Sequence, residues 1–168
     1  QTEERDALMA GKSDEKTNVM RTLEQKKIPY IPHIYADTPE TNGERIAAVL
    51  GEDPNRTFKT LVTVGKSGAH YVFVIPVCRE LNLKLAARSV GEKSIEMLKS
   101  KELLPLTGYV HGGCSPIGMK KTFPTVFDRS ALGFGTVYFS AGRIGYQVEM
   151  KLSDLSRILR FTTDAVTD

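Results

Sequence analysis

A glycine-rich segment at residues 108–121, GYVHGGCSPIGMKK, contains groups that could bind or cleave a ligand. Its inner glycines are Gly112, Gly113 and Gly118. Glycine lets successive backbone N–H groups turn toward one acceptor, as in anion-binding loops, and Lys120 and Lys121 follow directly. Met119 stands where a phosphate-binding P-loop has its lysine, so the segment is not a P-loop. It predicts a ligand-binding loop, with a plain glycine-rich connector as the alternative.

A lysine in an apolar strand is the second candidate. In the segment FKTLVTV, period-2 alternation places Lys59 on the same face as Leu61. The strand that follows is apolar on both faces, and a lysine is almost never fully buried without a partner. Lys59 is therefore expected at the mouth of a pocket or partly buried in one. The alternative is a lysine that extends into solvent at the strand end.

Two hydroxyl groups could also face a ligand. Ser140 ends an apolar strand just before Gly142, where its hydroxyl can point into a pocket or cap the turn. Tyr35 closes an edge strand and could stack on a ligand or hydrogen-bond to it, with half-buried packing as the alternative.

A cysteine nucleophile is a third possibility. Cys114 lies three residues after His111, and Asp128 could orient the histidine. Zinc is not expected, because Cys78 and Cys114 are isolated and no Cys-x-x-Cys or His-x3-His spacing occurs. The Gly-Phe-Gly at residues 133–135 lacks the third glycine of a dinucleotide fingerprint, so no cofactor is expected.

The composition predicts one domain. The chain has 168 residues, of which 40% are hydrophobic and 26% charged. We expect a loose tail at residues 1–15 and a folded domain at residues 16–168. The longest apolar run, at residues 71–77, is too short to cross a membrane, and no signal peptide is recognised. With only two cysteines, a cytoplasmic, reducing location is expected.

The charge is unevenly distributed. The net charge is +3, but residues 1–15 carry −3, so the remaining 153 residues carry +6. A mildly basic body suits an anionic partner such as RNA. The alternative is an ordinary surface of mixed charge.

The hydrophobic periodicity predicts a mixture of helices and strands. We expect a helix from Lys16 that ends at Pro29, an edge strand at 30–36, and a helix capped by Thr41 or Asn42 that ends at Gly51. A hairpin in the middle of a sheet is expected at 56–77.

Further helices are expected at 81–91 and 94–104, the second ended by Pro105, and a last one capped by Ser153. Short strands are expected around 125–128, 135–142 and 144–151. Because helices and hairpins do not alternate as regular βαβ units, the fold class is α+β.

Together these motifs resemble the YbaK/EbsC family of Cys-tRNA(Pro) deacylases. The match follows the chain in order over about residues 16–160. It consists of the Tyr35 strand with the following Glu-Thr-Asn at 40–42, Phe-Lys-Thr-Leu at 58–61, Gly-Gly-x-Ser-Pro-x-Gly-x-Lys-Lys at 112–121, Ser-x-Gly with a second glycine at 140–145, and a short Asp-Leu helix near the end. The resemblance implies a single compact domain with a mixed, mostly antiparallel sheet curling into a partly open barrel with flanking helices.

The resemblance also implies roles for individual residues. Lys59 would anchor the 3′-terminal adenosine and its phosphate, and Tyr35 would line the same pocket. The backbone amides of Gly112 and Gly113 would face the ester, with Ser140 beside the reacting group. Lys120 and Lys121 are assigned here to the tRNA backbone, where cations add sequence-independent affinity.

One position departs from the family pattern. Other members have an acidic residue where this chain has Gln147, and an amide cannot act as a carboxylate base. Glu149 lies two residues on, on the same strand face, and is the candidate substitute. Gln147 itself is still expected to bind the substrate.

The resemblance implies a trans-editing activity without an enzyme nucleophile. The thiol of the mischarged cysteine would attack its own ester, so Cys114 would not be catalytic. The implied partners are mischarged tRNA(Pro) and, transiently, prolyl-tRNA synthetase. The alternatives are a non-catalytic aminoacyl-tRNA or synthetase-binding module, an editing enzyme for alanine or serine, and the cysteine hydrolase described above.

Overall fold

The protein folds around two β-sheets. The computed structural model describes residues 15–168, so the tail expected at 1–15 lies outside the described residues except for Glu15. The small sheet has the order β1-β7-β6 and the large one the order β4-β2-β3-β5-β8. Their strands are β1 (Ile31–Ile34), β2 (Phe58–Gly65), β3 (His70–Pro76), β4 (Ile95–Met97), β5 (Thr125–Asp128), β6 (Val137–Arg143), β7 (Tyr146–Met150) and β8 (Thr162–Asp164).

The predicted hairpin forms the centre of the large sheet. β2 and β3 pair from Phe58 opposite Pro76 to Val64 opposite His70, and β4 and β5 flank them. One face of the hairpin packs into a core that includes Val62, and the other into a second core that includes Phe73. β4 pairs only with residues 63–65 of β2. The first half of β2 therefore has one edge without a strand partner, and this edge is where a pocket forms.

The helices cover the sheets and connect them. They are α2 (Asn18–Gln25), α3 (Gly43–Leu50), α4 (Leu83–Val90), α5 (Ser100–Thr107) and α6 (Leu152–Leu155), with a 3-10 turn η1 (Arg129–Gly133). Asn42 caps α3 through its side chain and Gly51 ends it in the left-handed conformation, as predicted. In the described part of the chain, no helix is long and apolar enough to cross a membrane.

Three details of the helix predictions are wrong. Residues 95–97 form β4 instead of the start of a helix, because Ile95 is buried against the large sheet opposite Gly65. α5 continues through Pro105 to Thr107. The proline removes the hydrogen bond that its N–H would donate to the carbonyl of Lys101, and Lys101 is an exposed residue. Ser153 is not a cap, since α6 already begins at Leu152 after Lys151.

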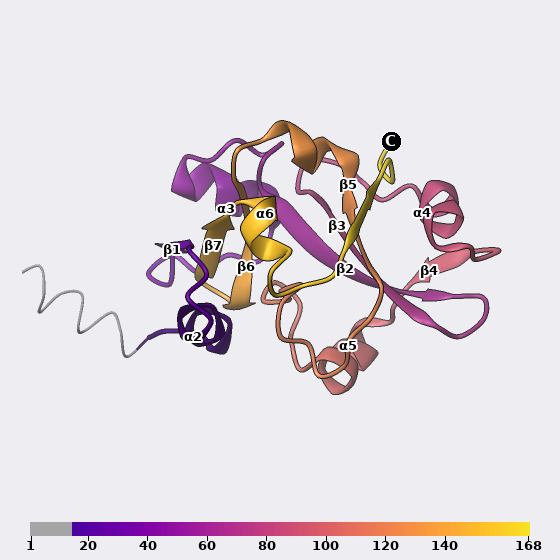
Figure 1. The fold of residues 1–168 in the computed structure, drawn as a ribbon, viewed down its shortest axis with the longest axis horizontal. Coiled ribbons are helices and arrows are strands. Elements are labelled where there is room, and N and C mark those ends of the chain that lie inside the picture. The colour runs from indigo at the N-terminus through magenta and orange to yellow at the C-terminus, as the bar shows by residue number, and fades with distance from the viewer. Residues whose placement is uncertain (1–14) are drawn as a thin grey trace, which may run out of the picture.

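The two sheets meet along β2 and β6. Tyr138 forms a parallel bridge with Thr57, and its N–H donates to the carbonyl of Arg56 at 3.1 Å. Figure 1 shows β2 as a long diagonal ribbon that runs from the small sheet toward β4 and α4. The sheets do not close into a barrel within residues 15–168.

The α+β prediction, with a mixed and mostly antiparallel sheet, is confirmed. β1 is an edge strand, as Pro32 indicated. The parallel pairs β3-β5 and β5-β8 join segments far apart in the sequence, and β8 was not predicted.

Candidate functional site

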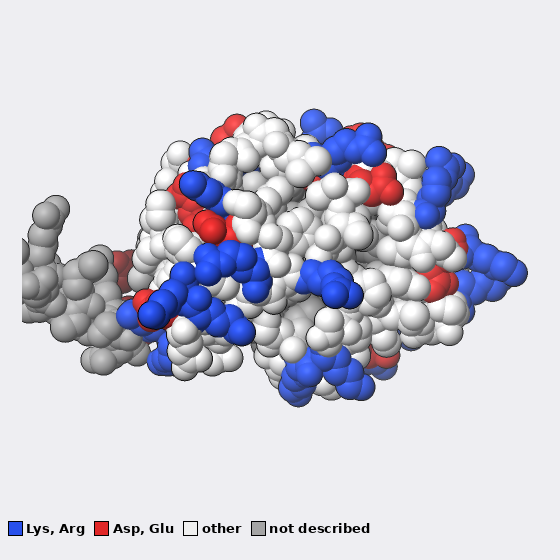
Figure 2. Space-filling view, in the orientation of Figure 1, with Lys and Arg blue, Asp and Glu red and all other residues white. Residues whose placement is uncertain are grey.

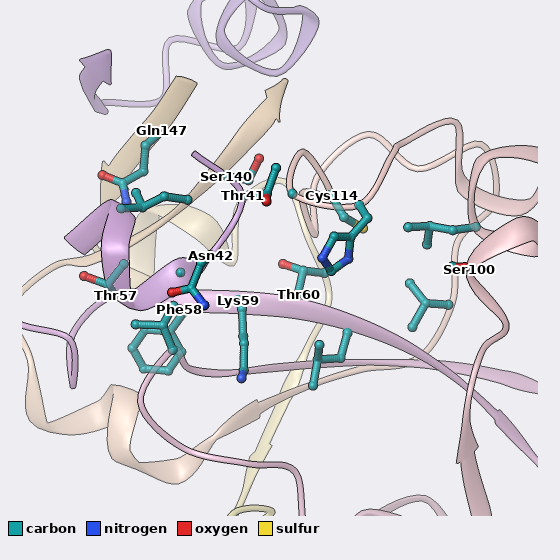
Figure 3. A pocket seen from close by; sticks show the side chains of 18 of the residues that line it. Thr41, Asn42, Thr57, Phe58, Lys59, Thr60, Ser100, Cys114, Ser140 and Gln147 are labelled. Carbon is teal, nitrogen blue, oxygen red and sulfur yellow. The ribbon is translucent and has the colours of Figure 1, made fainter. Parts of the chain in front are cut away.

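A pocket of about 360 Å³ opens beside the unpaired edge of β2. Its walls come from the start of α3, the first half of β2, the glycine loop, α5 and the β6–β7 hairpin (Figure 3). The polar or charged side chains that line it are Tyr35, Thr41, Asn42, Thr57, Lys59, Thr60, Ser100, His111, Cys114, Ser140 and Gln147. A cavity of this size with a few convergent polar groups is typical of a small-ligand site.

Lys59 and Thr60 leave β2 on opposite sides. Thr60 extends toward Thr41 and Ser140, and Lys59 extends away from them, although both residues line the pocket (Figure 3). Thr60 Oγ1 is buried and has no hydrogen-bond partner. The alternation that drew attention to Lys59 also places Thr60 on the opposite face of the strand. Sequence reasoning missed Thr60, because threonine is common in strands.

The segment before α3 forms one wall. Glu40 Oε1 accepts hydrogen bonds from the backbone N–H groups of Thr41 and Asn42, both at 3.0 Å. These bonds lower the pKa of Glu40. Asn42 Oδ1 accepts from the N–H of Arg45 at 3.1 Å. The Glu-Thr-Asn motif thus fixes the backbone that carries Thr41 and Asn42 into the pocket wall.

Tyr35 lies in the same wall and is buried. Its backbone N–H donates to the carbonyl of Gly145 at 2.8 Å, which ties the end of β1 to the β6–β7 turn. Burial raises the pKa of the Tyr35 hydroxyl, so it stays protonated at neutral pH. It can therefore act as a hydrogen-bond donor to a ligand.

The two central glycines of the loop take different places. Gly112 lines the pocket with φ +86°, and a Cβ there would lie 2.7 Å from Thr41 Cγ2. Gly113 is not among the lining residues, and its N–H donates to the carbonyl of Val110 at 3.0 Å. That amide is therefore engaged within the loop, so only Gly112 of this pair reaches the pocket.

Ser140 combines the two roles considered for it. Its Oγ accepts a hydrogen bond from the N–H of Gly142 at 3.1 Å, so it stabilises the turn. It also lines the pocket, and its hydroxyl can still donate (Figure 3). On the neighbouring strand it stands directly opposite Gln147.

Gln147 brings an unforeseen carboxylate to the site. Its side chain is 3% exposed and lines the pocket, and its Nε2 donates to Glu52 Oε1 at 3.0 Å. Thr57 Oγ1 donates to the same oxygen at 3.2 Å. Burial raises the pKa of Glu52, an effect that these two hydrogen bonds oppose. No local signal marked Glu52, which follows the glycine that ends α3.

Glu149, the expected substitute for an acid at position 147, is engaged elsewhere. It faces the same side of β7 as Gln147, but it accepts a hydrogen bond from His33 Nε2 at 2.8 Å and pairs with Arg56 at 3.2 Å. Thr136 also donates to it. Although burial opposes the change, these contacts lower its pKa. Glu149 is not among the pocket-lining residues.

The structure does not support a cysteine nucleophile. Cys114 is buried, and this burial raises the pKa of its thiol to about 12. Asp128, the proposed orienting acid, instead accepts hydrogen bonds from Ser130, Val166 and Thr167. Both the thiol activation and the charge relay are therefore missing. Within the described residues, no group of three potential metal ligands occurs.

Lys120 and Lys121 are exposed and do not line the pocket. Figure 2 shows several groups of Lys and Arg side chains on one face, with uncharged and acidic surface between them. The positive charge is thus spread over this face. Such a distribution suits sequence-independent contact with a polyanion.

The fold is an α+β domain with a polar pocket beside β2, and this pocket is suited to binding a small polar group. The family model of the aminoacyl-tRNA editing domain matches residues 39–158. The chain belongs to the aminoacyl-tRNA editing domain family, and its activity is that of an aminoacyl-tRNA deacylase acting on tRNA.

Individual relatives agree with this assignment. The chain is 46% identical over 140 residues to an Enterococcus faecalis protein described as "Putative Cys-tRNA(Pro)/Cys-tRNA(Cys) deacylase EbsC", covering 83% of this chain and 85% of that protein. It is also 28% identical over 123 residues to a proline–tRNA ligase of Pelobacter propionicus. That match covers 73% of this chain and 21% of the ligase.

Solved structures share the fold. A crystal structure of "a putative trans-editing enzyme for prolyl tRNA synthetase" has a TM-score of 0.74 at 23% identity, covering 87% of this chain and 92% of that one. A crystal structure of "hypothetical protein APE2540" has a TM-score of 0.81 at 24% identity, covering 90% of this chain and all of the other. The predicted YbaK/EbsC resemblance is therefore confirmed.

Proposed function

We propose that this protein hydrolyses mischarged Cys-tRNA(Pro), as a trans-editing deacylase, in the pocket beside β2. The observation that carries the proposal is the extended identity to the EbsC relative, which spans both the β2 segment and the glycine loop. Cysteine and proline are close in size, so a synthetase pocket discriminates poorly between them and a second site is needed.

The chemistry suits a pocket without its own nucleophile. The sulfur of the bound cysteine attacks its ester carbonyl carbon, a C–S bond forms, and the C–O bond to the ribose breaks. The thiol proton passes to the departing ribose oxygen, which yields tRNA and a thiolactone that water later opens. The protein then contributes orientation, for which effective molarities correspond to about 7–11 kcal/mol.

Several residues support this reaction by their positions. Ser140 and Tyr35 offer hydroxyl donors, and the missing side chain of Gly112 lets the glycine loop approach Thr41 closely at the pocket. A donor aimed at the developing oxyanion contributes about 3–4 kcal/mol. Lys59, on the outer side of β2, binds the terminal phosphate, and Lys120 and Lys121 bind the tRNA backbone.

The source of tRNA(Pro) specificity is assigned to a partner. A small domain offers little surface for reading bases, and part of a proline–tRNA ligase is similar to this chain. Transient association with prolyl-tRNA synthetase would deliver the tRNA, and the cytoplasm would be the site of action. Residues 16–168 form the editing domain in this proposal.

Single-turnover deacylation tests the function. Cys-tRNA(Pro), Ala-tRNA(Pro) and Pro-tRNA(Pro) are each mixed with excess protein, and the remaining ester is measured over time. Fast loss of cysteine alone is expected. Loss of alanine as well would require attack by water, since alanine has no thiol. Binding of all three without cleavage would instead identify a non-catalytic module.

A further inference from the structure

Two buried acceptor atoms that lack a partner belong to the Glu52–Gln147 pair in the pocket wall, and a third such atom lies on Thr60. Within the described residues, the buried side-chain atoms without a hydrogen-bond partner are Glu52 Oε2, Thr60 Oγ1 and Gln147 Oε1. Thr60 and Gln147 line the pocket, and Glu52 is bonded directly to Gln147. Because an unpaired buried polar atom costs about 1–3 kcal/mol, the two unpaired oxygens of the hydrogen-bonded Glu52–Gln147 pair indicate a missing donor.

The chemistry of these atoms defines the ligand group. An ionised carboxylate oxygen and an amide oxygen can only accept hydrogen bonds, and a threonine hydroxyl can do either. The bond from Gln147 Nε2 to Glu52 sets the orientation of the amide and leaves its oxygen as the free acceptor. The group that completes this wall must therefore be a donor with several hydrogens.

The charge balance indicates that this donor is a cation. Glu149 pairs with Arg56 and is hydrogen-bonded to His33, whereas Glu52 takes part in none of the ion pairs of the described residues. Its neighbours Gln147 and Thr57 are uncharged donors. A half-buried carboxylate without a cationic partner is costly unless a ligand provides one.

We infer that the Glu52–Gln147 pair recognises the α-ammonium group of the aminoacyl moiety. This inference rests on the proposed function and names the part of its substrate that this wall binds. Gln147 contacts the ammonium, and Glu52 acts through Gln147 as a positioning residue that also supplies the negative charge. Recognition of this group aligns the amino acid so that its side chain and ester carbonyl face Ser140 and Gly112.

Binding of a non-hydrolysable ligand pair tests the inference without relying on turnover. One ligand is adenosine carrying cysteine through a 3′-amide. The other carries 3-mercaptopropionate, which keeps the thiol and lacks only the amine. Titration calorimetry with the wild-type protein should give at least about tenfold tighter binding of the amine-bearing ligand, as expected for a charge-assisted hydrogen bond.

Two carboxylate variants localise the effect. Glu52→Gln preserves size and hydrogen bonding but removes the charge, and it should bring the two affinities to within about twofold of each other, because most of the charge-assisted contribution is lost. Glu92→Gln is the matched control, because Glu92 accepts hydrogen bonds from Ser67 and Tyr71 away from the pocket. It should retain the wild-type preference.

The outcomes separate the inference from the proposed function. Equal affinity of the wild-type protein for both ligands, or no binding of either, contradicts ammonium recognition even if no variant folds. Retained preference in Glu52→Gln contradicts the role of Glu52. A wild-type protein that prefers the amine but leaves Cys-tRNA(Pro) intact would contradict the deacylase function and uphold the inference.

Discussion

The side-chain amide of Gln147 on β7 donates a hydrogen bond to the carboxylate of Glu52 over 3.0 Å, across 95 residues of sequence. This contact places a negative charge directly behind a pocket wall. It also explains how a glutamine can stand in a position where the family resemblance led us to expect an acid. The carboxylate is supplied from the segment after α3 instead of from β7.

Glu52 should lower the stability of the free protein at neutral pH. Its pKa is raised by burial, so folding favours the protonated carboxyl. The wild-type protein is therefore relatively more stable below the unfolded pKa of glutamate, and it loses this advantage as the pH rises through the folded pKa. We expect Glu52→Gln to unfold at a higher temperature than wild type at pH 7 and at a similar one near pH 4.

Thermal unfolding monitored by circular dichroism measures this difference. The control is Glu149→Gln, because Glu149 has a lowered pKa and an ionic partner, Arg56. That variant should be less stable than wild type at pH 7 by about 1–3 kcal/mol. A Glu52→Gln protein that is less stable at pH 7 would show that Glu52 has a mainly structural role.

Gly112→Ala should impair the pocket. The positive φ alone costs about 1–3 kcal/mol for a residue with a side chain, and the new Cβ would press against Thr41 at 2.7 Å. We expect a loss of single-turnover deacylation that exceeds any loss of folded protein. Gly51→Ala is the matched control, since Gly51 also has a positive φ but has no atom within 4 Å of its Cβ position.

Gly51→Ala should lose a similar amount of stability and keep its deacylation rate. Equal rates in both variants would mean that the contact between Gly112 and Thr41 does not shape the site.

Cys114 should be chemically silent. Burial raises its pKa to about 12, so the thiolate that reacts with iodoacetamide is scarce at pH 8. We expect alkylation of the exposed Cys78 alone in the folded protein, and of both cysteines after unfolding, as read by mass spectrometry. Cys114→Ala should keep the wild-type deacylation rate. Selective labelling of Cys114 with loss of activity would restore the cysteine-hydrolase alternative.

Lys59 should act on tRNA binding more than on the chemical step, because its side chain leaves β2 away from Ser140 (Figure 3). Lys59→Ala should raise the half-saturating tRNA concentration and leave the saturated rate unchanged. The slope of log affinity against log salt should fall by about 0.7, as for the loss of one single-strand phosphate contact. Lys66→Ala, in the β2–β3 turn, is the control. A lower saturated rate with unchanged affinity would place Lys59 at the ester.

Much of the fold and part of the candidate site could be predicted from the sequence. Local signals such as the Asn42 cap, Gly51 and the apolar hairpin depend on neighbouring residues, and they predicted α3, β2 and β3 correctly. The residues with marked types, Tyr35, Ser140 and Gly112, do meet in one pocket. These features could be predicted because each depends on only a few adjacent residues.

The remainder depends on long-range contacts. The role of Glu52 could not be predicted, because it depends on the hydrogen bond from Gln147. The two residues are far apart in the sequence and meet only in the folded protein. The period-2 alternation of side chains along the strand predicted that Lys59 and Thr60 lie on opposite faces. It did not predict which of the two faces points toward Thr41 and Ser140. Likewise, Ile95 is a strand residue because it is buried against β2, although its local pattern also fits a helix.

The most direct test of the account is deacylation of Cys-tRNA(Pro) by wild type, Ser140→Ala and Ser89→Ala under single-turnover conditions. Ser140 lines the pocket, whereas Ser89 lies on α4 and donates to the carbonyl of Ala86. We predict fast cleavage by wild type and Ser89→Ala and a rate at least about a hundredfold lower in Ser140→Ala, the loss expected when a donor to the oxyanion is removed. Equal cleavage by all three proteins would contradict the assignment of the pocket, and no cleavage by wild type would contradict the proposed activity.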